Sequence, residues 1–141
     1  MADGMDLELQ GAIVAVLSAN GPLQALIGNP VRLYQQVPPN PTFPYVTIGP
    51  STENDDSVEH LDASEIFVAI DVWSRSVAGD WVECKRICSA IRRAIHNTDL
   101  TLTENRCVDI KHRITRELID ADNITRHGVV TLRAEMEENL S

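Results

Sequence analysis

Apolar residues near the N-terminus recur at intervals of three and four positions, which is the spacing of one face of an α-helix. The residues that share this face are Leu9, Ala12, Ile13, Val16 and Leu17. The run Asn20-Gly21-Pro22 ends the pattern, because proline cannot continue a helix and glycine accepts the left-handed conformation at a helix end. Proline suits the first turn of a new helix, so a short second helical segment is predicted from Leu23 to Ile27.

A longer amphipathic helix is predicted from about Ala78 to His96. Its apolar face again advances in steps of three and four, through Val77, Trp81, Cys84, Cys88, Ile91 and Ile95. Acidic residues come early in this segment and basic residues come late, an order that complements the helix dipole. His96 is therefore interpreted as a residue of the helix C-terminus and not as a catalytic base.

Other segments show the alternation of β-strands. Short strands are predicted at Val31–Tyr34 and Tyr45–Gly49, with a stiff proline-rich connection between them. The clearest inner strand is Glu65–Trp73, which carries apolar residues on both faces. One face holds Ile66, Val68, Ile70 and Val72, and the other holds Phe67, Ala69 and Trp73. We expect cover on both faces, by a helix on one side and by a neighbouring subunit on the other.

A long hairpin with one wet face is predicted near the C-terminus. Its first strand runs from Asn105 to Leu118 and turns at Asp120–Asn123. Its apolar positions are Val108, Ile110, Ile114 and Leu118 on the first strand, and Val130, Leu132, Ala134 and Met136 on the second. The order of elements predicts an α+β fold, with an antiparallel or mixed sheet of about four to five strands and two main helices packed on one face. The length suits a single domain over residues 1–141.

The stretch from Pro50 to Ser64 is polar and acidic, and is predicted to be a long, mobile loop. Its carboxylates are Glu53, Asp55, Asp56, Glu59 and Asp62. Asn54-Asp55-Asp56 resembles the start of a calcium loop, but the glycine and glutamate that such a loop requires are missing, so no metal site is expected.

The formal net charge of −9 is concentrated in the first half of the chain. Up to Asp71 there are ten acidic residues and one basic residue, Arg32, whereas the second half holds eleven of each. Proteins that grip nucleic acid need a basic patch, so direct DNA binding is not expected. No apolar run approaches the roughly 20 residues of a membrane helix, and the acidic N-terminus lacks the basic region of a signal peptide, so a cytoplasmic origin is expected.

The sequence contains no clear motif for catalysis or metal binding. Cys84, Cys88 and Cys107 are interpreted as small buried apolar residues, because their spacing fits no zinc module. His112 falls at an inward strand position, where a hydrogen-bonded histidine of the core or of an interface is expected. There is no phosphate-binding glycine loop and no nucleophile elbow in the sequence.

The cluster Thr125-Arg126-His127-Gly128 lies where the hairpin turn becomes a strand. Gly128 at such a position allows a close backbone approach or a bulge. Arg126, His127 and Arg133 are then strand and rim residues, for which we expect a role in structure or at a subunit interface and not in catalysis.

Four stretches together resemble one family. They are Phe43-Pro44-Tyr45-Val46-Thr47-Ile48-Gly49, Asp71-Val72-Trp73-Ser74-Arg75, the helix ending at Ile95-His96, and Ile124-Thr125-Arg126-His127-Gly128-Val129-Val130. Their order and spacing are similar to those of the small tail-completion, or tail-terminator, proteins of long-tailed phages and of gene transfer agents.

The resemblance implies a structural protein that caps the head-proximal end of the tail tube as a ring, typically a hexamer. Its partners would be its own copies, the tail tube protein and the head-side connector or stopper. It would be made in the host cytoplasm and reside in the virion tail at the head–tail junction. The family carries no catalytic residues and implies no cofactor or membrane partner, and DNA would pass through the ring without specific binding.

Three other interpretations stay open at this point. The chain could be another ring component of the same neck, such as an adaptor or stopper, since these share its size and α+β content. It could also be a small cytoplasmic enzyme or a monomeric binding module. For the ring, we hypothesise that Glu53, Asp55, Asp56, Glu59 and Asp62 line the channel and repel the DNA backbone, the rival account being that they only keep the protein soluble.

Overall fold

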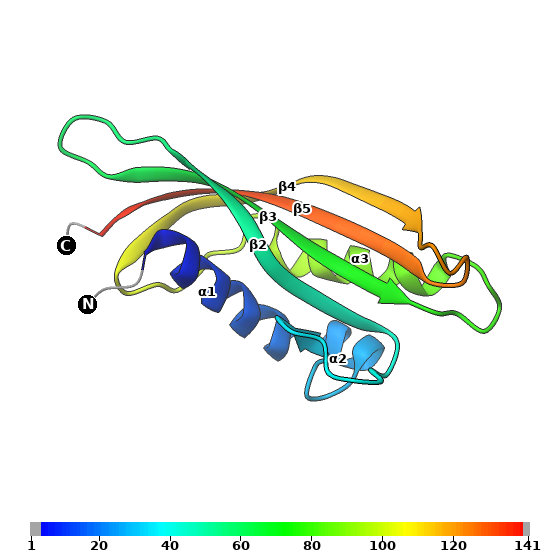
Figure 1. The fold of residues 1–141 in the computed structure, drawn as a ribbon. Helices are drawn as coiled ribbons and strands as arrows, with labels where there is room; N and C mark the ends of the chain where they lie inside the picture. Colours follow the sequence, from blue (N-terminus) through cyan, green and yellow to red (C-terminus); the bar gives the residue numbers. More distant parts are fainter. Residues whose placement is uncertain (1–3, 140–141) are drawn as a thin grey trace.

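The computed structural model describes residues 4–139 and shows three helices with a five-stranded sheet (Figure 1). The elements are α1 (Met5–Ala19), α2 (Gly21–Ile27), β1 (Leu33–Tyr34), β2 (Tyr45–Asp55), β3 (Ala63–Ser74), α3 (Val82–Ile95), β4 (Asn105–Ile119) and β5 (Arg126–Glu138). This is the predicted α+β arrangement. No single helix in the described part of the chain is long and apolar enough to cross a membrane.

The strand order is β1-β2-β3-β5-β4, with β1 parallel to β2 and every other pair antiparallel. Side chains along β3 alternate strictly between buried and half-buried. Ile66, Val68, Ile70 and Val72 face the helices and are buried in the core. Their neighbours Phe67, Ala69 and Trp73 lie on the opposite face, which we call the open face because no described helix covers it.

The N-terminal helices form as the sequence predicts. Leu9, Ile13 and Leu17 of α1 are buried against the sheet. The side chain of Asn20 accepts a hydrogen bond from the Leu23 amide at 2.9 Å, which caps α2. The carboxylate of Glu8 accepts hydrogen bonds from the backbone amides of residues 103–105 at 2.8–3.3 Å, so it ties α1 to the start of β4.

Helix α3 begins at Val82, four residues later than predicted. Val77, which fits the helical spacing, is fully exposed in the preceding loop. The chain turns at Gly79, whose φ of 71° interrupts any helix there. The Asp80 side chain accepts a hydrogen bond from the Val82 amide at 3.1 Å, so the helix starts after this turn.

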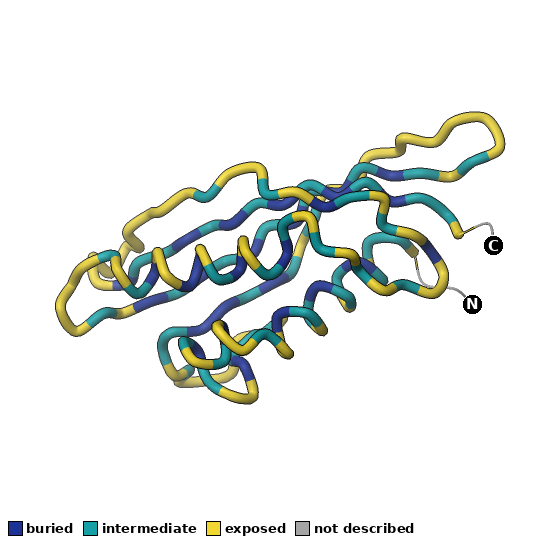
Figure 2. The backbone as a smooth tube through the Cα atoms, turned by 180° about the vertical axis from the view of Figure 1, so that it is seen from behind, coloured by how far each residue is buried: buried dark blue, intermediate teal, exposed yellow. Residues whose placement is uncertain are grey.

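Residues 50–64 do not form the predicted loop. Strand β2 continues to Asp55 and β3 begins at Ala63, so most of this stretch is a paired hairpin, which we call the acidic arm. The register shifts between Ile48 and Ser51, where Gly49 and Pro50 form an irregularity. The arm projects at one end of the molecule, and residues 52–60 are all exposed (Figure 2). Backbone pairing alone forms this hairpin, and its exposed side chains leave no pattern of apolar positions in the sequence.

Strand β4 differs from its predicted alternation because it contains two register shifts, between Cys107 and Asp109 and between His112 and Ile114. Each shift inserts one extra residue and reverses the faces that follow. Ile110 is therefore buried in the core, whereas Ile114 and Leu118 lie on the open face. Strand β1 is also shorter than predicted and spans only Leu33–Tyr34.

Gly128 allows α3 to approach β5 closely. A Cβ atom at this position would lie 2.5 Å from Cys88 Sγ and 3.0 Å from Cys84 Sγ. Both cysteines are buried, so the thiols fill the space that the glycine leaves. The predicted close backbone approach at Gly128 is confirmed.

We predict that Gly128→Ala lowers the free energy of unfolding by about 1–3 kcal/mol, because the added methyl group overpacks the contact with α3. Denaturant unfolding followed by circular dichroism measures the change. Gly49→Ala is the matched control, since a Cβ there meets no atom within 4 Å. Adding Cys88→Ala to the Gly128 variant should recover part of the loss. An equal loss in both glycine variants would contradict the packing explanation.

Candidate interaction surface

Aromatic side chains form a row across one end of the open face. The ring centroids of Phe43 and Tyr45 lie 5.0 Å apart, those of Tyr45 and Trp73 6.4 Å apart, and those of Trp73 and His127 3.9 Å apart. The last pair stacks with an interplanar angle of 12°. Trp73 Nε1 also donates a hydrogen bond to Thr47 Oγ1 at 3.1 Å, which fixes the indole on the sheet. The row is thus rigid and amphipathic, with Tyr45 buried and with Phe43, Trp73 and His127 half-buried.

His127 is held by an acidic partner from the neighbouring strand. Its Nε2 lies 2.7 Å from Asp71 Oδ1, and both side chains are half-buried. The pairing of Trp73 with His127 across β3 and β5 brings the three side chains together. The cluster therefore orients the imidazole on the open face.

The middle of the open face is apolar. Ile114 and Leu118 of β4 are 50% and 43% exposed, although they lie within a sheet. Leu118 pairs with His127 and Ile114 pairs with Thr131, so both flank β5 on the open side. Exposed aliphatic side chains next to the aromatic row extend an apolar surface that water covers in the isolated chain.

Arg133 lies on the same face, six residues from His127. Its Nε donates to Glu65 Oε2 at 2.6 Å, and its guanidinium also contacts Glu135. The hydrogen bond to Glu65, together with the negative charge of both carboxylates, raises the pKa of Arg133. These three charged residues mark the boundary between the apolar part of the open face and the acidic arm.

Arg126 lies on the other side of β5 and does not join His127 and Arg133. It donates to the carbonyl oxygen of Gly79 at 2.7 Å and lies over the Trp81 ring at 5.1 Å. These contacts hold the loop before α3 against the β4–β5 turn. Of the three residues predicted for a subunit interface, the structure therefore places two on the open face and one within the fold.

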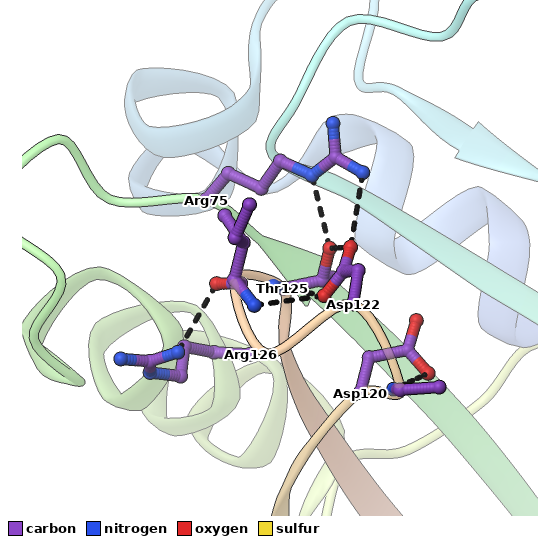
Figure 3. A network of polar contacts seen from close by, with 7 residues as sticks. Arg75, Asp120, Asp122, Thr125 and Arg126 are labelled. Atoms are coloured by element: carbon purple, nitrogen blue, oxygen red, sulfur yellow. Dashed lines mark hydrogen bonds and ion pairs between the residues drawn. The ribbon is translucent and has the colours of Figure 1, made fainter.

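The β4–β5 turn is organised around Asp122 (Figure 3). Its carboxylate accepts hydrogen bonds from the Thr125 hydroxyl at 2.6 Å and from the amides of Ile124 and Thr125, both at 2.8 Å. Arg75 reaches across from the end of β3 to both Asp122 and Thr125. Led by the bonds from Thr125, these contacts place the pKa of Asp122 well below its ordinary value.

The acidic arm lies at the opposite end of the open face. Within the arm, Glu53 accepts from the Ser64 hydroxyl, and Asp55 accepts from both the amide and the hydroxyl of Ser57. Glu59 contacts only the exposed His60. No lysine or arginine occurs in residues 50–64, and none of the five carboxylates forms an ion pair with one in the described structure. The arm therefore carries negative charge that no lysine or arginine balances in the described structure.

Cys107, His96 and His112 lie in surroundings that favour a structural role. Burial raises the pKa of the Cys107 thiol to about 11, so it is protonated near neutral pH. His96 Nδ1 accepts the His112 amide at 2.9 Å, and His112 Nε2 lies 2.7 Å from Thr115 Oγ1. Burial, followed by Arg92 and His96, lowers the pKa of His112. Within residues 4–139 no three His, Cys, Asp or Glu side chains are grouped to hold a metal ion.

A family model for the tail completion protein gp17 matches residues 11–137, nearly the whole chain. The chain belongs to the tail completion protein family. A solved structure agrees with this: a chain from the virion of a native gene transfer agent (GTA) particle has a TM-score of 0.88 and 25% sequence identity. The likeness covers 96% of this chain and 99% of that one. Comparison with curated proteins gave no match.

Membership of the tail completion family identifies a structural virion protein of a phage-type tail. The four stretches that carried the resemblance lie in β2, at the end of β3, at the end of α3 and at the start of β5. Three of these meet in the aromatic row. The residues by which the sequence resembles the tail completion family are thus also those that organise one end of the open face.

In this tail completion protein we predict that Asp122→Asn lowers the melting temperature at neutral pH, because the bonds from Thr125 and Arg75 weaken. A carboxyl with a lowered pKa in the folded state contributes stability above its ordinary pKa of about 3.9, and this contribution is lost as the pH falls toward the lowered value. The difference from the wild type should therefore persist down to about pH 4 and shrink below it.

Thermal unfolding between pH 2 and pH 7 measures this effect. Asp99→Asn is the control, because it makes the same charge change at an exposed residue with no hydrogen bond or ion pair in the described structure. A difference between wild type and Asp122→Asn that is equally large at both ends of the range would contradict the assigned role.

Proposed function

We propose that the protein caps the head-proximal end of the tail tube as a ring, typically a hexamer, ends tube growth and presents a docking surface to the head-side connector. Membership of the tail completion family and the likeness to a chain of a gene transfer agent virion support this proposal. The observation that carries it is the open face, where an aromatic row and exposed aliphatic residues lie on a sheet without helix cover. A surface of this kind suits contact with a neighbouring subunit or with another tail protein.

The cap explains how a small protein can end a polymer. A tube grows because each layer exposes the surface that the next layer binds. A ring that binds the last layer on one side and offers a different surface on the other stops this repetition. The two ends of this chain differ in charge and in shape, as the acidic arm lies at one end and the β4–β5 turn at the other (Figure 1). Such asymmetry suits a ring with two different faces.

The same proposal gives the acidic arm a place beside the DNA. Carboxylates of the arm that face the channel would repel the phosphate backbone and keep DNA from adhering as it passes. Glu53, Asp55, Asp56, Glu59 and Asp62 are the candidates. Their mutual repulsion is tolerable because salt screens exposed charges over about 8 Å at physiological ionic strength.

Removal of the protein should give tail tubes of uncontrolled length that fail to join heads. Electron microscopy of particles from producing cells measures tube length and the fraction of heads with tails. Ile114→Asp should reproduce this defect, because it places a charge on the apolar part of the open face, whereas Val77→Asp in an exposed loop should not. Tubes of normal length in cells that lack the protein, or a single copy per tail, would contradict the proposal.

Replacing Asp55 and Asp56 by lysine should leave the fold intact, since both residues are exposed on the arm. The assembled cap should then bind DNA in a salt-dependent way and slow its passage. Replacement of the same residues by asparagine is the control, because it removes negative charge without adding positive charge. Normal DNA delivery by the lysine variant, with no binding at low salt, would favour solubility as the role of these carboxylates.

A further inference from the structure

The tip of the acidic arm combines apolar and acidic groups on a tight turn. Val58 and Leu61 close the turn through two backbone hydrogen bonds of 3.1 Å. Val58 is 65% exposed although it is aliphatic. Glu59 lies between these two residues, and Asp62 follows directly. The tip therefore offers a small apolar knob flanked by negative charge.

A groove of matching character lies between α2 and α3. Its volume is about 500 Å³. Its lining combines small and apolar side chains with two arginines: Pro22, Leu26, Arg86, Ala90, Arg93 and Ala94. No carboxylate of the described chain forms an ion pair with Arg86 or Arg93. The groove is thus apolar along its walls and positively charged on α3.

The arm and the groove cannot meet within one subunit. The tip projects at one end of the molecule, beyond the helices, and α2 lies toward the other end (Figures 1 and 2). Between two subunits placed head to tail, however, the tip of one copy points toward the groove end of the next. A contact between two different patches of this kind builds a ring whenever its rotation closes.

We propose that the tip of the acidic arm of one subunit docks in the α2–α3 groove of the next subunit. Val58 packs against the apolar walls formed by Leu26 and Ala90, and Glu59 pairs with Arg86 or Arg93. The stem of the arm, which carries Glu53, Asp55 and Asp56, then spans the gap between neighbours. In this arrangement Glu59 serves the subunit contact, and the stem carboxylates are the ones left to face the channel. This inference rests on the proposed ring and names the contact that links its subunits.

Charge is the reason that the occupant is a second copy. Each subunit carries a formal net charge of −9, so copies repel one another unless opposite charges meet at the contact. The arm holds the densest unpaired negative charge of the described chain, and the outer side of α3 holds arginines without acidic partners. Bringing these two surfaces together turns the repulsion into attraction at the contact.

Cross-linking in assembled tails tests the contact directly. One variant carries Val58→Cys and Ser89→Cys, since Ser89 is exposed on the groove lining and serine and cysteine have similar shapes. A short bismaleimide should link the chain to further copies of itself and give a ladder on a denaturing gel. Two controls should give no ladder: the unmodified protein, in which Cys84 and Cys88 are buried and only Cys107 is half-buried, and a Val58→Cys, Val108→Cys variant. A single accessible thiol per chain links at most two copies.

A charge exchange provides the second measurement. Glu59→Arg or Arg93→Glu alone should reduce incorporation into tails by about tenfold or more, because like charges then face each other in the contact. The double variant should restore incorporation. Arg113→Glu, on exposed β4 outside the groove, is the control for the loss of a positive charge. Circular dichroism shows whether each variant is folded before incorporation is scored.

The outcomes separate the contact from the ring. A ladder together with rescue by the double variant supports the inference. A ring of several copies without the Val58–Ser89 cross-link overturns it and leaves the cap standing. A cross-link from Val58 to the tube protein or to the connector also overturns it, because the arm then has a different occupant. A single copy per tail removes both the contact and the proposed cap.

Discussion

The structure depends on the packing of all its helices on one face of a long sheet. Helix α3 reaches that face closely only because β5 has a glycine where Cys84 and Cys88 press against it. With α1 and α2 beside it, α3 buries a row of side chains on β3 and on β5, together with Val46 and Ile48 of β2 and Ile110 of β4. The opposite face then receives no cover from the helices of the described chain. One-sided packing therefore sets the stability of the subunit and leaves the open face available for contact with another molecule.

Regions that bury apolar side chains could be predicted from the sequence. The spacing of Leu9, Ile13 and Leu17 identified α1, and the alternation around Ile66 and Ile70 identified β3. The acidic arm was missed as a hairpin because Thr52–Asp55 pair with β3 but bury no apolar group. When both faces of a hairpin are exposed to solvent, its strands need no apolar residues, so the hydropathy pattern does not reveal the backbone pairing.

Irregularities explain the remaining differences. Val77 continues the spacing of α3 but stands before the turn at Gly79, where the helix has not begun. The two register shifts in β4 reverse the faces of its residues, so Ile114 lies on the open face whereas Ile110 lies in the core. No local signal in the sequence marks either shift, because their positions follow from pairing with β5. The aliphatic patch on the open face was therefore not predictable from alternation alone.

The candidate surface depends on residues that are distant in sequence. Arg126 and His127 are adjacent in the chain, yet the period of a strand sends them to opposite faces. The imidazole of His127 is oriented by Asp71 and Trp73, which the antiparallel register places beside it. The order of residues along the chain thus predicted the strand β5 but not which of its side chains share the open face.

In the proposed ring, an acidic subunit that assembles with copies of itself would face a physical conflict. Net negative charge keeps free copies soluble and apart, whereas a closed ring requires that neighbours touch. Apolar burial alone would hold them together but would not distinguish head-to-tail contacts from contacts between equivalent patches, which form pairs. In the proposed contact, opposite charges on the acidic arm and on α3 would make this distinction, because they favour head-to-tail contacts and disfavour the contact of like patches. The separation of the acidic arm from the arginines of α3 would therefore give each subunit of the proposed ring a direction, which a closed head-to-tail ring requires.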